Sequence, residues 1–355
     1  MEKTLNQKKD IYWINALKAL CMIFVYFGHS ELYYGAYIET INWFRLTFNT
    51  NAFFFISGYL LFWKQLSPPR IDADVKNYVK GGMCKTAGNI MHRIIIPSVI
   101  FAILVFFPKN LLRGSEITFQ NFIYDTIGGT TFWFTSALVV AEFILLLLLM
   151  TRRKNIWFYV LICVGFALGG WYLANNDINI VKGSGSFPWH YKQGLISLVY
   201  IAAGGLYWRY EKQIQKVLYK WVTILLTIAF VIVVLVWHDN MEFITSLCRI
   251  NYLGYFVTLL ATILLIEFCR SISEIKTLSF IGQNTMGYYF LSGAVPNVTA
   301  ILALKIIPGI HWWMLLLLWV INLFVATFFV KLMNRWMPWL FDIRLFKKSN
   351  QNTTI

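Results

Sequence analysis

Two ionisable side chains, Lys18 and His29, lie eleven residues apart within the apolar stretch 13–30, WINALKALCMIFVYFGHS. At about 100° per residue, this spacing puts both on nearly the same helix face, about 16 Å apart along the axis. An ionisable residue inside a spanning segment is a functional-site hypothesis by default. A histidine titrates near neutrality, so His29 is the candidate general base for a reaction that removes a proton from a hydroxyl group. A snorkelling lysine and an interfacial histidine are the structural alternative.

Two carboxylates are candidates for orienting the imidazole and stabilising its protonated form. Glu31 is close in sequence, and Glu142 lies inside a later apolar segment. Glu142 follows Trp133 by nine residues, about 13 Å deeper along a helix, where a carboxylate needs a partner such as Lys18 or a histidine. The alternatives are a solvated loop residue for Glu31 and a structural buried ion pair for Glu142. We expect Glu142 to support the site.

The composition indicates what must position these residues. Of the 355 residues, 58% are hydrophobic and 13% are charged, against about 25% charged in soluble domains. We expect an all-α integral membrane protein, a bundle of about ten transmembrane helices, because a spanning backbone must satisfy its hydrogen bonds internally. The segments near the required length of roughly 17 to 25 residues are approximately 12–30, 43–63, 90–107, 132–150, 156–174, 194–209, 219–237, 250–269, 279–303 and 312–334.

The loop charges predict the orientation. With the N-terminus inside, 23 of the 31 Lys and Arg residues fall on the cytoplasmic side and seven, including Arg45, on the outer side. This asymmetry favours ten spans with both termini cytoplasmic, in a multi-pass protein of the cell membrane. It also explains the net charge of +15 without a nucleic-acid partner. We expect one transmembrane domain over 1–346 and a polar tail over 347–355. The five cysteines have no metal-ligand spacing, so no metal is expected.

Five short motifs, taken together and in order, resemble the acyltransferase-3 family of membrane acyltransferases, and most of all its fucose-4-O-acetylase-like branch. They span almost the whole chain. They read Lys18 with Gly28-His29-Ser30; Phe48-Asn49-Thr50-Asn51-Ala52 followed by Phe53-Phe54-Phe55-Ile56-Ser57-Gly58-Tyr59-Leu60; Arg93-Ile94-Ile95-Ile96-Pro97; Trp133-Phe134; and Ile281-Gly282-Gln283-Asn284-Thr285.

The resemblance implies an enzyme, a membrane O-acyltransferase of the O-acetyltransferase type. It would move an acyl group from cytoplasmic acetyl-CoA, or another acyl-CoA, to a hydroxyl of a cell-surface or lipid-linked glycan in the cell envelope. The donor would need cations on the inner face for its phosphates, and Lys18, Lys85 and Arg93 are the candidates. The alternative for Lys85 and Arg93 is ordinary positive-inside residues.

Three further residues are candidates for contact with the substrates. Asn49 and Asn51 are placed to hydrogen-bond an acyl oxyanion or to orient His29, unless they cap a helix. Trp133 has a ring that can stack on a sugar, unless it belongs to an interfacial aromatic belt.

The chain departs from the family pattern at four positions. Asn15 replaces an acidic residue, Asn49 and Asn51 replace a histidine and a proline, and Ser292 stands at a late histidine position. An altered activity or an inactive scaffold therefore stays open. The main rival is a transporter or flippase of a glycan or small acid that carries out no chemistry, although no internal repeat of the kind many transporters show is evident.

Overall fold

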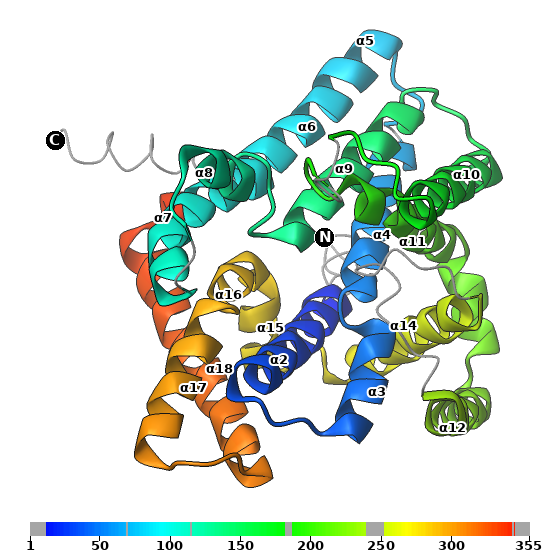
Figure 1. The fold of residues 1–355 in the computed structure, drawn as a ribbon. Helices are drawn as coiled ribbons and strands as arrows, with labels where there is room; N and C mark the ends of the chain where they lie inside the picture. The colour runs from blue at the N-terminus through cyan, green and yellow to red at the C-terminus, as the bar shows by residue number, and fades with distance from the viewer. Residues whose placement is uncertain are drawn as a thin grey trace, which may run out of the picture. The chain divides into compact units, whose positions relative to one another are not determined.

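The computed structural model describes residues 12–68, 70–113, 116–181, 187–238, 252–342 and 344, and every regular element among them is helical (Figure 1). The helices are α2 (Tyr12–Tyr34), α3 (Glu39–Phe48), α4 (Asn51–Leu66), α5 (Val75–Asn77), α6 (Lys85–Ile90), α7 (Ile96–Arg113), α8 (Phe119–Thr126), α9 (Trp133–Leu149), α10 (Ile156–Asn175), α11 (Tyr191–Val217), α12 (Lys220–Trp237), α14 (Tyr252–Ile272), α15 (Lys276–Gln283), α16 (Thr285–Leu291), α17 (Ala294–Ile306) and α18 (Trp312–Trp336). Two π-helices, η1 (Tyr78–Cys84) and η2 (Met91–Ile95), and a 3-10 helix, η4 (Pro338–Leu340), complete the set.

The all-α class is confirmed, and each of the ten predicted apolar segments coincides with helical structure. Five helices are long and apolar enough to cross a membrane, and α16 with α17 adds a sixth if this pair, bent by 44°, counts as one span. The chain is therefore a multi-pass membrane protein. The five spans are Val75–Leu111, Ile156–Asn175, Lys220–Trp237, Leu253–Ile272 and Trp312–Trp336.

Two predicted segments are not continuous helices, and the prediction is wrong in that respect. Segment 43–63 breaks at Asn49 and Thr50 into α3 and α4, and segment 279–303 divides into α15, α16 and α17. Side chains at the second break bond the backbone of the preceding turn. The Asn284 amide donates to the Phe280 carbonyl (2.8 Å), and the Thr285 hydroxyl donates to the Gly282 carbonyl (2.6 Å). Such local bonds compete with continued helix.

The described residues form two compact units. The first comprises 12–53, 219–238 and 252–337, and the second comprises the described parts of 54–218 and 338–344. The division is one of contacts within the structure and does not test whether residues 1–346 form one domain, which stays a prediction. The predicted tail, 347–355, lies outside the described residues.

Helix α2 is the central helix of the first unit, where α3, α14, α15, α16, α17 and α18 pack against it (Figure 1). Thirteen of its 23 residues are buried. Gly282 allows α15 to approach closely, because a Cβ at this position would lie 2.7 Å from the Asn15 Cα. The outer helices also bond α2 directly: the Tyr26 hydroxyl donates to the Tyr288 carbonyl (2.9 Å). A polar side chain on α2 can therefore be satisfied by a neighbouring helix, as Tyr26 is.

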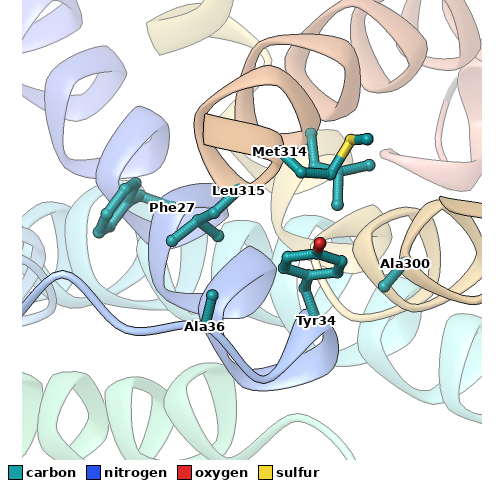
Figure 2. Packing of buried hydrophobic residues seen from close by; sticks show 7 residues of the cluster. Phe27, Tyr34, Ala36, Ala300, Met314 and Leu315 are labelled. Carbon is teal, nitrogen blue, oxygen red and sulfur yellow. The ribbon is translucent and has the colours of Figure 1, made fainter. Parts of the chain in front are cut away.

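The C-terminal end of α2 contributes to a cluster of apolar side chains with α17 and α18. Figure 2 shows Phe27 and Tyr34 from α2 beside Ala300 of α17 and Met314 and Leu315 of α18. The helix ends at Tyr34, and the next residue, Gly35, has a φ of +83°, in the left-handed region that favours glycine. This packing fixes the end of α2 that carries His29.

The second unit is built on glycine contacts between helices. A Cβ at Gly204 of α11 would lie 2.8 Å from the Tyr59 backbone nitrogen of α4, and one at Gly58 would lie 2.7 Å from the Ile201 backbone. Small residues at such positions let helix backbones approach closely in membranes. The glycines that dilute predicted segment 194–209 thus stand at packing contacts within α11, a helix of 27 residues.

Candidate functional site

His29 lies one turn before the end of α2 and is half-buried. Its ring stacks on Tyr33, with 6.0 Å between ring centroids and 16° between ring planes. The Nδ1 atom is buried and makes no hydrogen bond within the described part of the chain. One nitrogen of this imidazole is therefore not committed to a structural bond, which a proton acceptor requires.

The glycine before His29 makes room for a cation. The guanidinium of Arg45 on α3 lies against Gly28, and a Cβ on this glycine would come within 2.7 Å of Arg45 Cζ. One turn away, Phe48 of α3 meets Phe24 of α2 edge to face, with centroids 5.3 Å apart. Helix α3 therefore docks on the face of α2 that carries Gly28, and it brings a positive charge next to the candidate base.

Glu31 holds this cation in place. Its Oε2 lies 3.6 Å from Arg45 Nη2, and its Oε1 accepts hydrogen bonds from the Ile38 backbone N–H and the Asn42 side-chain amide, both at 2.8 Å. The Asn42 Oδ1 in turn accepts from Arg45 Nε at 2.9 Å. Glu31 is 1% exposed, so it is not a solvated loop residue, and these groups hold its carboxylate. The loop charges indicate Arg45 only as an outer basic residue, so this cluster was not predicted.

The two predicted asparagines stand at the break between α3 and α4. Asn49 and Asn51 are both buried, and α4 begins at Asn51. The Asn49 backbone N–H donates to the Arg45 carbonyl (3.1 Å), whereas its side-chain Oδ1 is buried and accepts no hydrogen bond from a described residue. Asn49 therefore keeps a polar group available at the position where a family histidine would stand.

Lys18 is half-buried on α2, three turns before His29. Asn15, one turn earlier, is the residue whose backbone meets Gly282. The motif around Gly282 therefore has a packing role, since it seats α15 against the turn before Lys18. The amide of Asn334 on α18 donates to Asn284 Oδ1 (2.7 Å), which ties the end of the same motif to α18.

Glu142 belongs to the second unit, whereas His29, Lys18 and the asparagines belong to the first. It lies within α9, is 8% exposed, and accepts a hydrogen bond from the Ser57 hydroxyl of α4. The buried carboxylate of Glu142 was predicted to need a partner, and the neutral hydroxyl of Ser57 is one such partner. Ser57, which the sequence shows only as part of the second motif, was not predicted to contact Glu142.

Four cations, Lys64, Arg70, Lys85 and Arg93, belong to the stretch of chain between the end of α4 and the start of α7, which is predicted to face the cytoplasm. Burial lowers the pKa of Lys64, and the nearby charges of Arg70, Lys85 and Arg93 lower it further, whereas the carboxylate of Glu142 has the opposite effect. Lys85 is exposed, and Arg70 Nη1 is buried without a hydrogen bond to any described residue. Cations this close repel one another, so the cluster favours an anion. Lys64 and Arg70 were not among the predicted binding residues.

Arg93 already has one anionic partner. Its Nε donates to Asp342 Oδ2 at 3.0 Å, and Arg344 also pairs with Asp342, through Nη2 at 2.6 Å and Nε at 2.8 Å. The two guanidinium groups, Arg344 foremost, hold the pKa of Asp342 well below its usual range. The Arg93 side chain is 64% exposed. It therefore remains accessible to a second anion in spite of this pair.

Trp133 begins α9, where its ring meets that of His190 edge to face with centroids 6.5 Å apart. His190 stands at the N-terminal end of α11, so the segments that lead into α9 and α11 converge at Trp133. Among the described residues, no group of three or more His, Cys, Asp and Glu side chains could hold a metal ion.

A family model described as an acyltransferase domain, that of the acyltransferase-3 family, matches residues 11–335. This range includes every predicted site residue. It covers both units except for the described residues after 335. No curated protein and no solved structure matches the chain significantly.

Proposed function

Because the chain belongs to the acyltransferase-3 family, we propose that this membrane acyltransferase uses an acyl-CoA, acetyl-CoA first of all, to acylate a glycan. The acceptor is a hydroxyl of a cell-surface or lipid-linked sugar in the cell envelope, as in the fucose-4-O-acetylase-like branch. The observation that carries this proposal is the buried Nδ1 of His29, which makes no hydrogen bond to a described residue in a family member's first helix.

The proposed chemistry is direct acyl transfer with His29 as general base. The imidazole accepts the proton as the sugar oxygen attacks the thioester carbonyl carbon. A carbon–oxygen bond forms, the carbon–sulfur bond breaks, and the proton passes to the departing CoA thiolate. The tetrahedral intermediate carries negative charge on the former carbonyl oxygen, and the amides of Asn49 and Asn51 are the proposed donors to it. Glu142 is proposed to support the site, in the role of a carboxylate beside a catalytic imidazole.

The proposed donor site lies in the second unit. Acyl-CoA carries phosphates, which lysine and arginine bind through charge-assisted hydrogen bonds. The cluster of Lys64, Arg70, Lys85 and Arg93 provides the cations, and Lys18 is proposed to add another at the first helix. The π-helices η1 and η2 lie in the same stretch of chain, and π-helical turns are frequent at functional sites.

We propose that the chain crosses the cell membrane ten times, with both termini in the cytoplasm. The support is the asymmetry of the loop charges and the agreement of the ten apolar segments with helices. On this topology the cation cluster faces the cytoplasm, where acyl-CoA is made, and the loops before α9 and α11 face outward.

The test is transfer of label by the full-length protein in nanodiscs, given radiolabelled acetyl-CoA and candidate envelope glycans. We expect labelled glycan and stoichiometric CoA release, with the rate in His29→Ala reduced by 10² to 10⁴-fold, the usual contribution of a general base. A matched control is His238→Gln, which changes a histidine that stacks on Trp43 at 3.8 Å between centroids. It should retain full activity.

Two outcomes would overturn the enzyme proposal. If the wild-type protein releases no CoA and His29→Ala keeps its biological function, no acyl transfer takes place. If the protein instead moves a glycan or small acid across the bilayer without consuming CoA, it is a transporter.

A further inference from the structure

Helix α11 of the second unit is longer than a bilayer crossing requires. Its 27 residues extend over about 40 Å, against a hydrocarbon core of roughly 30 Å. A Cβ at Gly205 would lie 2.6 Å from Phe62 Cε2, and the Phe62 ring meets that of Tyr159 with centroids 5.6 Å apart. The Tyr159 hydroxyl donates to the carbonyl of Arg153, in the basic turn between α9 and α10 (3.0 Å). Gly205 is thus linked to this turn, and residues 209–217 continue the helix about 6 to 18 Å past Gly205.

One face of this extension packs on its own unit. Tyr207 is buried, and its ring lies beside that of Phe55 on α4, with 5.6 Å between centroids. One turn further on, Glu211 accepts a hydrogen bond from the Tyr59 hydroxyl of α4 at 2.7 Å. Ile214 follows and is half-buried. These spacings of four and three residues place Tyr207, Glu211 and Ile214 on one helix face. That face is the inner one.

The opposite face carries three cations, Arg209, Lys212 and Lys216. At about 100° per residue they fall within about 60° of one another and opposite the inner face, and they span about 10 Å along the axis. All three side chains are exposed. None of them makes an ion pair or a hydrogen bond with a described residue. The extension therefore presents a positively charged face that the described part of the chain does not neutralise.

The helix does not need this arrangement for its own stability. Like charges three or four residues apart, as in Arg209 with Lys212 and Lys212 with Lys216, destabilise a helix. A cation in the last turn interacts favourably with the helix dipole, which accounts for Lys216 but not for Arg209, two turns earlier. An anion held against the three side chains would remove their mutual repulsion. The cationic face therefore suits an anionic ligand from outside the chain.

Apolar side chains flank the cations. Tyr210 is 36% exposed and Val217 is 64% exposed, and both lie to one side of the cationic face of α11. Tyrosine is enriched where a membrane meets water, because its ring is apolar and its hydroxyl is polar. A dissolved anion makes no use of such side chains, whereas a lipid brings a charged headgroup and acyl chains together. The combination favours a phospholipid over a free phosphate.

We propose that Arg209, Lys212 and Lys216 on α11 bind the headgroups of anionic phospholipids. Basic clusters just beyond a membrane span attract such lipids electrostatically. The leaflet concerned depends on the proposed topology, on which α11 crosses the bilayer and this end faces the cytoplasm. The lipid site goes beyond the proposed function, since it requires no acyl transfer.

The test counts bound lipids on the full-length protein. The protein is titrated in mixed micelles with phosphatidylglycerol or with phosphatidylcholine, and native mass spectrometry measures the bound fraction. We expect tighter binding of phosphatidylglycerol, weakened by added salt. A basic residue near an anionic membrane contributes about fivefold in affinity, so the variant Arg209→Gln/Lys212→Gln/Lys216→Gln should bind phosphatidylglycerol about 100-fold more weakly. Its affinity for phosphatidylcholine should not change.

A matched control removes the same charge elsewhere in the second unit. The variant Lys76→Gln/Lys80→Gln/Arg153→Gln changes three other exposed cations, and it should retain most of the affinity for phosphatidylglycerol. Lys212→Arg/Lys216→Arg keeps the charges and should bind as the wild type does. The comparison of the two lipids on the wild type needs no variant, so it decides the matter even if a substituted protein does not fold.

Three results would overturn the proposal. They are equal binding of the two lipids by the wild type, an equal loss of affinity in the α11 variant and the matched control, and displacement of phosphatidylglycerol by inorganic phosphate, which would mean a site for small anions. Acyl transfer is assayed separately. If phosphatidylglycerol binds as expected but no acyl group is transferred, the proposed function fails and the lipid site stands. If acyl transfer occurs without lipid preference, only the lipid site fails.

Discussion

Gly28→Ala is predicted to destabilise the protein through Arg45 alone. The new Cβ would lie 2.7 Å from Arg45 Cζ, whereas ordinary contacts begin at 3.4 Å, so the guanidinium must move by about 0.7 Å or more. Arg45 is not free to yield, because Asn42 and Glu31 hold it and only 12% of its side chain is exposed. Overpacking of a well-packed site costs about 1–3 kcal/mol, which is the loss of unfolding free energy that we expect.

A double-mutant cycle assigns this loss to the proposed contact. Arg45→Lys keeps the positive charge near Glu31 but removes the branched head that meets the Gly28 position. In the Arg45→Lys background, Gly28→Ala should cost less than about 0.5 kcal/mol, which gives a coupling energy of about 0.5–3 kcal/mol, the range for residues in contact. Unfolding in mixed detergent micelles, followed by circular dichroism, measures all four proteins under one condition.

Equal costs of Gly28→Ala in the two backgrounds would refute the reasoning. That result would mean that the alanine methyl group clashes with something other than the guanidinium, and that Arg45 does not determine the need for glycine before His29.

Three further predictions concern the packing and the donor site. Asn322→Leu should lower the unfolding free energy by about 1 kcal/mol, because Asn322 makes two bonds to other helices and such bonds average about 0.6 kcal/mol in membranes; an unchanged unfolding curve would contradict this. Gly204→Ala should abolish the yield of monodisperse protein on size exclusion, since the Cβ meets backbone atoms, while Gly169→Ala, with nothing within 4 Å, should not. Arg93→Ala should raise the KM for acetyl-CoA about tenfold, the equivalent of one charge-assisted contact, while Asp342→Asn should leave it unchanged or lower it, because it removes a competing anion.

The helices were predictable because their apolar runs have the length of a membrane span, and this signal does not depend on which neighbours a helix meets. The breaks were not predictable on the same grounds. The run of 43–63 is interrupted by Arg45 and by the polar triplet Asn49-Thr50-Asn51, but a few polar residues within an otherwise apolar segment do not by themselves mark the end of a helix such as α3. The glycines of α11 diluted its hydropathy, and their function became visible only through Phe55 and Tyr59 of α4.

The candidate site shows the same division. His29 was found because an ionisable residue in an apolar run is conspicuous in the sequence. Its neighbour Arg45 was not, because the contact depends on the angle at which the short helix α3 returns to α2. The sequence offered one signal of this contact: Gly28, before His29, lacks a side chain and so allows another group to approach the helix closely. The cation cluster could be predicted in part, as Lys85 and Arg93, but Lys64 and Arg70 join it only through the fold.

The turn of α2 that carries His29 is held on several sides, and this bears on what the histidine can do. Ser30 accepts a hydrogen bond from Asn322 (2.8 Å), which in turn accepts one from Thr299 (2.5 Å), so α17 and α18 are tied to this turn. Arg45 covers Gly28, and Glu31 anchors Arg45. A histidine that merely marked the membrane interface would need no such support. A general base does, because proton transfer requires its nitrogen to be held within hydrogen-bond reach of the reacting oxygen. The contacts of Ser30, Gly28 and Glu31 supply the support that the proposed general base at His29 requires.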